Sequence, residues 1–147
     1  MSTFSISFDL ATNCPTLGMG FEFWIDDDLY IDRSSIEQPE TIVIDSISDL
    51  AHSTSRAMTF VFKNKKLEHT ILGENNSFIQ DPVITIDNFK IDNIDCGHIL
   101  HQLAEYYHDF NGTGAPTIDK FYGTMGCNGR VALEFKTPIF IWLLEHM

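Results

Sequence analysis

Apolar and polar residues alternate strictly in several separate segments of this chain, and this period of two constrains its fold more than any other feature. The first such segment carries the apolar residues Phe4, Ile6, Phe8 and Leu10. Successive side chains of a strand point to opposite faces, so the alternation predicts a strand with one buried face. The same period recurs at 21–25, 58–62 and 131–135. We therefore expect several strands that share one apolar face.

Turn residues between these segments predict that most strands are joined as hairpins. Three aspartates at 26–28 separate two strand-like segments, and Asn128-Gly129 is a dipeptide strongly preferred in two-residue hairpin turns. Asp87-Asn88 predicts a further turn within 83–91. Strands joined in this way pair in antiparallel fashion.

Helical spacing of apolar residues predicts one long helix at about 96–110. At about 100° per residue, one face of that helix would carry Ile99, Leu103, Tyr106, Tyr107 and Phe110. Thr137-Pro138 suits the start of a C-terminal helix at about 138–147, with a continuing strand as the alternative. A capping-box pattern at 46–49 predicts a short helix that ends near Ser55.

These elements predict the fold class. A chain of 147 residues suits one hydrophobic core, and it contains no internal repeat or linker. We expect a single α+β domain over residues 1–147. It would be mainly an antiparallel sheet built from hairpins, covered by the long helix and the C-terminal helix.

Charge excludes some functions and favours others. The formal net charge is −12, and residues 1–55 hold ten acidic residues and one arginine, a net −9. Nucleic acids and anionic lipids would repel such a chain, so we expect neither direct nucleic-acid binding nor membrane binding. A solubilising acidic surface is one explanation. A basic protein partner is the other, because complementary charge accelerates association.

The sequence therefore favours a small acidic binding protein that neutralises a basic protein. The hypothesis is an immunity or inhibitor protein, an antitoxin, that blocks a toxin domain such as a nuclease. Its candidate partner-binding residues lie around the first predicted hairpin: Glu22, Trp24, Asp26, Asp27, Asp28, Tyr30, Asp32 and Glu37. One alternative is a phage or mobile-element protein that imitates DNA to occupy a defence enzyme. A homodimer formed through strand edges is a further option.

Four side chains on the predicted long helix are the candidate metal ligands. His98, His101, Glu105 and His108 would lie within one arc of its surface and suit zinc, nickel or copper. A polar, solvated helix face explains the same pattern, so we expect no metal and no other cofactor. The sequence also lacks a recognisable nucleophile motif, which makes an enzyme the less favoured class.

The expected location is the cytoplasm. No apolar run is long enough to cross a bilayer, and the first ten residues do not resemble an export signal. Cys14, Cys96 and Cys127 are odd in number and widely spaced, which argues against a disulfide framework and indicates a reducing compartment.

Overall fold

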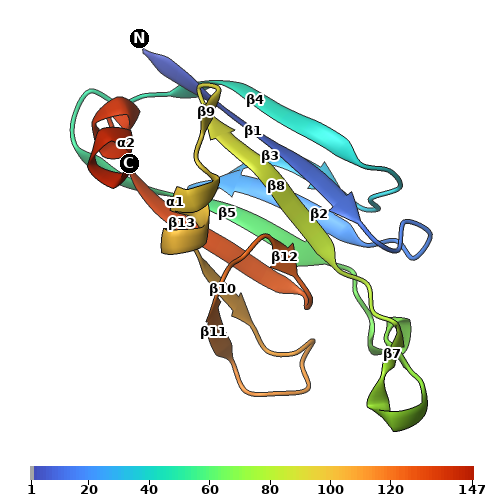
Figure 1. The fold of residues 1–147 in the computed structure, drawn as a ribbon. Coiled ribbons are helices and arrows are strands. Elements are labelled where there is room, and N and C mark those ends of the chain that lie inside the picture. The colour runs from blue at the N-terminus through green and yellow to red at the C-terminus, as the bar shows by residue number, and fades with distance from the viewer. Residues whose placement is uncertain (1) are drawn as a thin grey trace.

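Two antiparallel sheets pack face to face in the computed structural model, which describes residues 2–147 (Figure 1). Sheet A contains, in spatial order, β12 (Thr124–Met125), β8 (Ile84–Ile91), β1 (Thr3–Thr12) and β4 (Glu40–Ser48), with β9 (Ile94–Asp95) paired to β8. Sheet B contains β11 (Thr117–Lys120), β10 (Glu105–His108), β13 (Gly129–Thr137), β5 (Thr54–Lys63), β2 (Gly20–Ile25) and β3 (Asp28–Arg33). The architecture is a β-sandwich.

The core lies between the two sheets and is built by the alternating residues. Phe8, on β1 of sheet A, lies at the centre. Its ring centroid is 5.8, 5.3 and 5.2 Å from those of Phe21, Phe23 and Phe60 on sheet B. The period-two prediction for these strands is confirmed, because the alternating apolar residues at 4–10, 21–25 and 58–62 that point toward the other sheet are all buried.

The predicted fold class is wrong in its helices. Strands make up 51% of the structure and helices 14%, so the protein is mainly β rather than α+β, and no long helix covers a sheet. Helix α1 (Gly97–Leu103) stops because Ala104 is extended, with φ −71° and ψ 143°, and β10 follows. β10 pairs with both β11 and β13, so its backbone gains hydrogen bonds on two edges. This tertiary pairing outweighs the local helical spacing.

Three shorter predictions are also wrong. Asn128-Gly129 does not join a hairpin, because β12 before it belongs to sheet A and β13, which starts there, belongs to sheet B. Residues 46–48 continue β4 instead of starting a helix, and Ile47 fills the core. Asp49, the last residue of that capping-box pattern, has another role, because its Oδ1 accepts a hydrogen bond from the backbone N–H of Ile139 at 2.8 Å. Strand β8 runs through the predicted Asp87-Asn88 turn, and the chain reverses at Asp92-Asn93, where both φ angles are positive, at 50° and 64°.

The C-terminal helix is present as α2 (Ile139–His146), at one end of the sandwich (Figure 1). It begins after Thr137-Pro138 and packs Trp142 against Phe135 of β13, with ring centroids 6.3 Å apart. None of the helices in residues 2–147 combines the length and the apolar character that crossing a bilayer requires.

A short two-stranded ribbon projects from the opposite end of the sandwich (Figure 1). It consists of β6 (Ile71–Leu72) and β7 (Phe78–Gln80), with 3₁₀ turns at Leu67–His69 and Glu74–Asn76. We call residues 66–80 the arm. Its base is fixed by Lys65, whose buried Nζ donates to Asp81 Oδ1 at 2.6 Å and to the carbonyls of Pro82 and Gly126 at 2.8 and 2.6 Å.

Candidate functional site

The predicted acidic hairpin exists as β2 and β3, joined by a two-residue turn. Asp26 adopts a positive φ of 53° in this turn. Its carboxylate accepts hydrogen bonds from Arg56 Nε at 2.9 Å and from the backbone N–H of Ala57 at 3.0 Å. Asp26 is therefore a structural residue that fixes the turn to β5, and Arg56 compensates its charge.

Two further acidic residues of the hairpin are compensated by one lysine. Lys63 Nζ lies 2.7 Å from Glu22 Oε2 and 2.5 Å from Asp32 Oδ1. The hydrogen bonds from Lys63 and from the Trp24 indole N–H, at 2.8 Å, lower the pKa of Glu22. The negative field expected from the hairpin is thus partly cancelled within the fold.

The outer part of the hairpin keeps accessible groups. Asp27, Asp28 and Glu37 are exposed, and none of them forms an ion pair within residues 2–147. Leu29 and Tyr30 lie beside them on β3, an edge strand of sheet B, and are 45% and 40% exposed. Trp24 is half-buried. Partner binding at this hairpin stays a prediction, carried now by the exposed subset.

The structure reveals a second acidic surface that the sequence did not indicate. Asp9, Asp45, Asp87 and Asp92 lie on or beside the outward side of sheet A, on β1, β4 and the β8–β9 region. Their neighbours on this side are mostly small, namely Ser5, Ser7, Ala11, Thr41 and Thr85, and Val43, which is 58% exposed, is the larger apolar side chain among them. We call this surface the sheet A face. None of its four aspartates forms an ion pair within the described residues, and Lys90 is its one base.

Asp9 lies in the middle of the sheet A face and is held in its ionised form. Asn88 Nδ2 donates to Asp9 Oδ2 at 2.6 Å, and Thr41 Oγ1 donates to Asp9 Oδ1 at 2.7 Å. These two hydrogen bonds, helped by the nearby Lys90, lower the pKa of Asp9. Asp87 is its direct neighbour across the β1–β8 pair. Two carboxylates therefore face solvent side by side.

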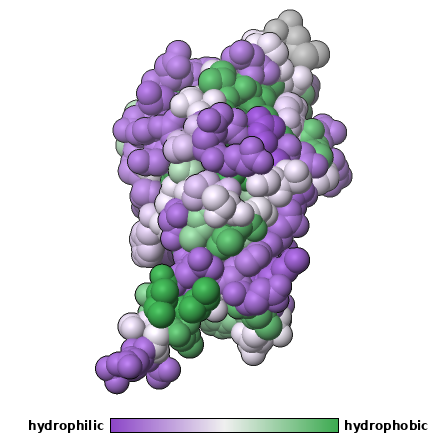
Figure 2. Space-filling view, turned by 90° about the vertical axis from the view of Figure 1, so that its right-hand side faces the viewer, coloured by the Kyte–Doolittle hydropathy of each residue, from purple (hydrophilic) through white to green (hydrophobic). Residues whose placement is uncertain are grey.

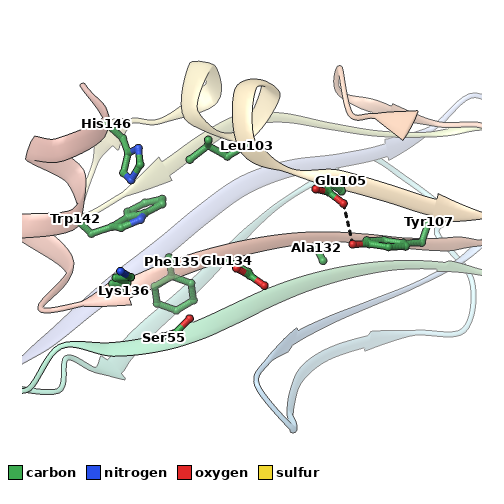
Figure 3. A pocket seen from close by; sticks show the side chains of 10 residues that line it. All are labelled: Ser55, Leu103, Glu105, Tyr107, Ala132, Glu134, Phe135, Lys136, Trp142 and His146. Carbon is green, nitrogen blue, oxygen red and sulfur yellow. Dashed lines mark hydrogen bonds between the residues drawn. The ribbon is translucent and has the colours of Figure 1, made fainter. Parts of the chain in front are cut away.

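A groove of about 430 Å³ lies between α2, the end of α1 and the outward side of sheet B (Figure 3). Its lining includes Glu105, Glu134 and His146. The Tyr107 hydroxyl donates to Glu105 Oε2 at 2.9 Å, which raises the pKa of Tyr107. Ser55 is the one serine that lines the groove, and its hydroxyl has no hydrogen bond to a histidine or carboxylate in the part of the chain described. The groove can contact a ligand but shows no activated nucleophile.

Strand register joins this groove to the predicted hairpin. Ala132 in the groove lies opposite Thr59 of β5, and Thr59 lies opposite Trp24 of β2. Paired residues share a face, so Trp24 and the groove are parts of the same outward side of sheet B, about two strand spacings or 10 Å apart.

The four metal candidates do not come together. His98 and His101 are exposed on α1, whereas Glu105 and His108 belong to β10, three positions apart and therefore on opposite faces of the strand. His108 Nε2 instead lies 2.7 Å from Asp119 Oδ2. Across residues 2–147 no group of three or more His, Cys, Asp or Glu side chains is arranged to hold a metal ion. The shared arc depended on a long helix that ends at Leu103.

The cysteines of the described chain are all free, and the most buried, Cys96, has its thiol pKa raised by burial. No protein-family model, curated protein or solved structure matches the chain.

Proposed function

We propose that this chain is a binding protein that neutralises a basic protein partner, in the manner of an immunity or inhibitor protein acting on a toxin such as a nuclease. The observation that carries the proposal is the sheet A face, where four aspartates without an ion-pair partner among residues 2–147 stand among small side chains. A cytoplasmic location is part of the proposal.

The physical argument concerns unpaired charge. Carboxylates that already form an ion pair with a lysine or arginine of the same chain attract a cationic partner only weakly, as at Glu22 and Asp32. The aspartates of the sheet A face lack such partners, and small neighbours leave them open to contact. Unpaired surface charge of one sign steers an oppositely charged protein and raises its association rate.

The exposed part of the hairpin supplies a second contact region. Arg33, at the end of β3, pairs with Glu40, at the start of β4, with Nε and Oε1 2.9 Å apart. This ion pair joins the edge of sheet B to the edge of sheet A. A partner on the sheet A face that reaches past this edge would meet Asp28 and Tyr30, where a rigid aromatic side chain is a good anchor.

The experiment is capture of partners on immobilised protein from a lysate of its own source, eluted by a salt step. Two double variants with equal change in net charge are compared. D45K/D87K changes the sheet A face, whereas E134K/E145K changes exposed carboxylates on β13 and α2. We expect one basic protein to be retained, with loss of retention confined to D45K/D87K. Equal loss with both variants would show that only total charge matters and would contradict the assignment.

Imitation of DNA is the second candidate, favoured by the same face. Asp9 and Asp87 are cross-strand neighbours, with Cβ atoms of such a pair roughly 5 Å apart, and Asp45 and Asp92 lie on or beside the same side of sheet A, so several negative charges are gathered on one surface. This candidate predicts that the retained protein binds nucleic acid and that added duplex DNA releases it. Retention that DNA does not affect would favour the first candidate.

A further inference from the structure

We propose that the arm is a self-association surface, and that its occupant is the arm of a second copy of this chain. Five large apolar side chains are exposed between 44% and 72% on this short segment: Leu67, Ile71, Leu72, Phe78 and Ile79. Figure 2 shows apolar surface gathered at the lower end of the molecule, next to a hydrophilic tip. Large contiguous apolar patches on a protein surface mark interaction sites.

The arm is held in a defined position rather than left as a loose loop. At its base, Lys65 Nζ donates three hydrogen bonds that connect the start of the arm to Asp81, Pro82 and Gly126. Thr70 Oγ1 donates to Asp81 at 3.0 Å, and Gln80 Nε2 donates to the carbonyl of His69 at 2.8 Å, so the two sides of the arm are tied together. A fixed apolar projection loses little conformational freedom when it is covered.

Charge makes the arm the part of the surface at which a second copy can approach. Two copies of a chain with a net charge of −12 repel each other through most of their surface. The arm carries one lysine, Lys66, and two acidic residues, Glu68 and Glu74, and is therefore close to neutral. Contact through the arms also keeps the two sheet A faces apart, because the arm projects from the end of the sandwich (Figure 1).

The exposed area is sufficient for a weak dimer. A fully exposed side chain of this size presents roughly 200 Å², so the five side chains leave on the order of 500 Å² uncovered. Leu72 and Phe78 are paired on one face of the ribbon, whereas their strand neighbours Ile71 and Ile79 point to the other face, so a single contact buries about half of this area. A standard interface buries about 800 Å² on each partner, so contact through the arm gives a weak dimer. Strands β6 and β7 pair only with each other in residues 2–147, so each also keeps a free edge for backbone hydrogen bonds.

The test is the solution mass of the full chain, measured by light scattering after size exclusion at loading concentrations from about 1 to 500 μM, the range in which weak dimers form. We expect the mass to rise from the 16.7 kDa of one chain toward twice that value. F78D/I79D should weaken the association at least tenfold. F140D/I141D is the matched control, because it adds the same two charges and because Phe140 and Ile141 are 59% and 56% exposed on α2, at the other end of the sandwich.

Two results would overturn the proposal: a wild-type chain that stays at the mass of one copy at every concentration, or an F78D/I79D variant that associates as the wild type does. Circular dichroism and the melting temperature verify that the double variant folds, which is expected because both side chains are exposed. The measurement needs no partner protein, so its outcome is separate from that of the capture experiment.

Discussion

Lys65 links the arm to both sheets from a buried position, and its replacement by methionine should destabilise the fold. The side chain is 2% exposed, and its three N–H donors are all used. Its acceptors lie before β8 of sheet A and just before β13 of sheet B, so one ammonium group connects three segments that are distant in the sequence. Methionine keeps the length and apolar character of the stem but donates no hydrogen bond.

The expected loss follows from what the substitution leaves behind. Removing one member of a buried ion pair costs about 3–5 kcal/mol, because the remaining charge and acceptors are left without partners. Asp81 is 31% exposed, so water can solvate part of its carboxylate. We therefore expect a loss near the lower end, about 3 kcal/mol of unfolding free energy. For a chain of this size that corresponds to a fall in melting temperature of roughly 6–12 °C.

The assay is urea unfolding followed by circular dichroism, with thermal unfolding as the second measurement. K120M is the control, because Lys120 is exposed on β11 and has no side-chain hydrogen bond in the described structure. Its unfolding free energy should stay within about 0.5 kcal/mol of the wild-type value. If K65M also stays within that margin, the argument that the ion pair holds the base of the arm is refuted.

Three further outcomes are expected. Y106F should lower the unfolding free energy by about 1–2 kcal/mol in the same urea assay, because the Tyr106 hydroxyl both accepts from the backbone N–H of Cys127, at 2.8 Å, and donates to its carbonyl. Asp9 should make stability depend on pH, because folding lowers the pKa of its carboxyl below the ordinary value of 3.8. The ionised carboxylate therefore stabilises the fold above about pH 4, and this contribution is lost as the pH falls further. Between pH 5 and 3, the unfolding free energy of D9N should fall less than that of the wild type. Equal losses in the two proteins would contradict this. Added zinc should leave the melting temperature of the untagged protein unchanged, since the four candidate ligands are separated; a saturable rise would show that they meet.

The strands were predictable because their signal is local. Alternation along Phe4–Leu10 or Phe21–Ile25 depends only on which face of a strand is buried, and the structure buries those residues. The long helix failed for a reason outside its own sequence. Tyr106 and His108 suit a helix by spacing, but they sit between two strands that supply hydrogen bonds, and one of those strands, β13, comes more than twenty residues later.

The candidate site was predictable only where its residues are neighbours in sequence. The hairpin at 22–32 was located correctly, but the residues that pair with three of its five carboxylates, Arg56 and Lys63, lie on β5 and reach it through strand pairing. The sheet A face was missed because positions 9, 45, 87 and 92 come together only when β1 lies between β4 and β8. The outward position of Asp9 within the predicted alternating strand was the one signal that could have led to it, and by itself it does not reveal which strands lie beside β1.

The position of β13 has a consequence for the time at which the chain can fold during synthesis. This strand lies between β10 and β5, so sheet B exists as two separate pieces until residues 129–137 are available. The aromatic residues of β2 and β5 can meet β1 earlier, but their sheet keeps an unpaired edge until then. Completion of sheet B must therefore follow translation of β13, and a ribosome-bound chain that stops before it would present β5 as an open edge to chaperones or to other chains.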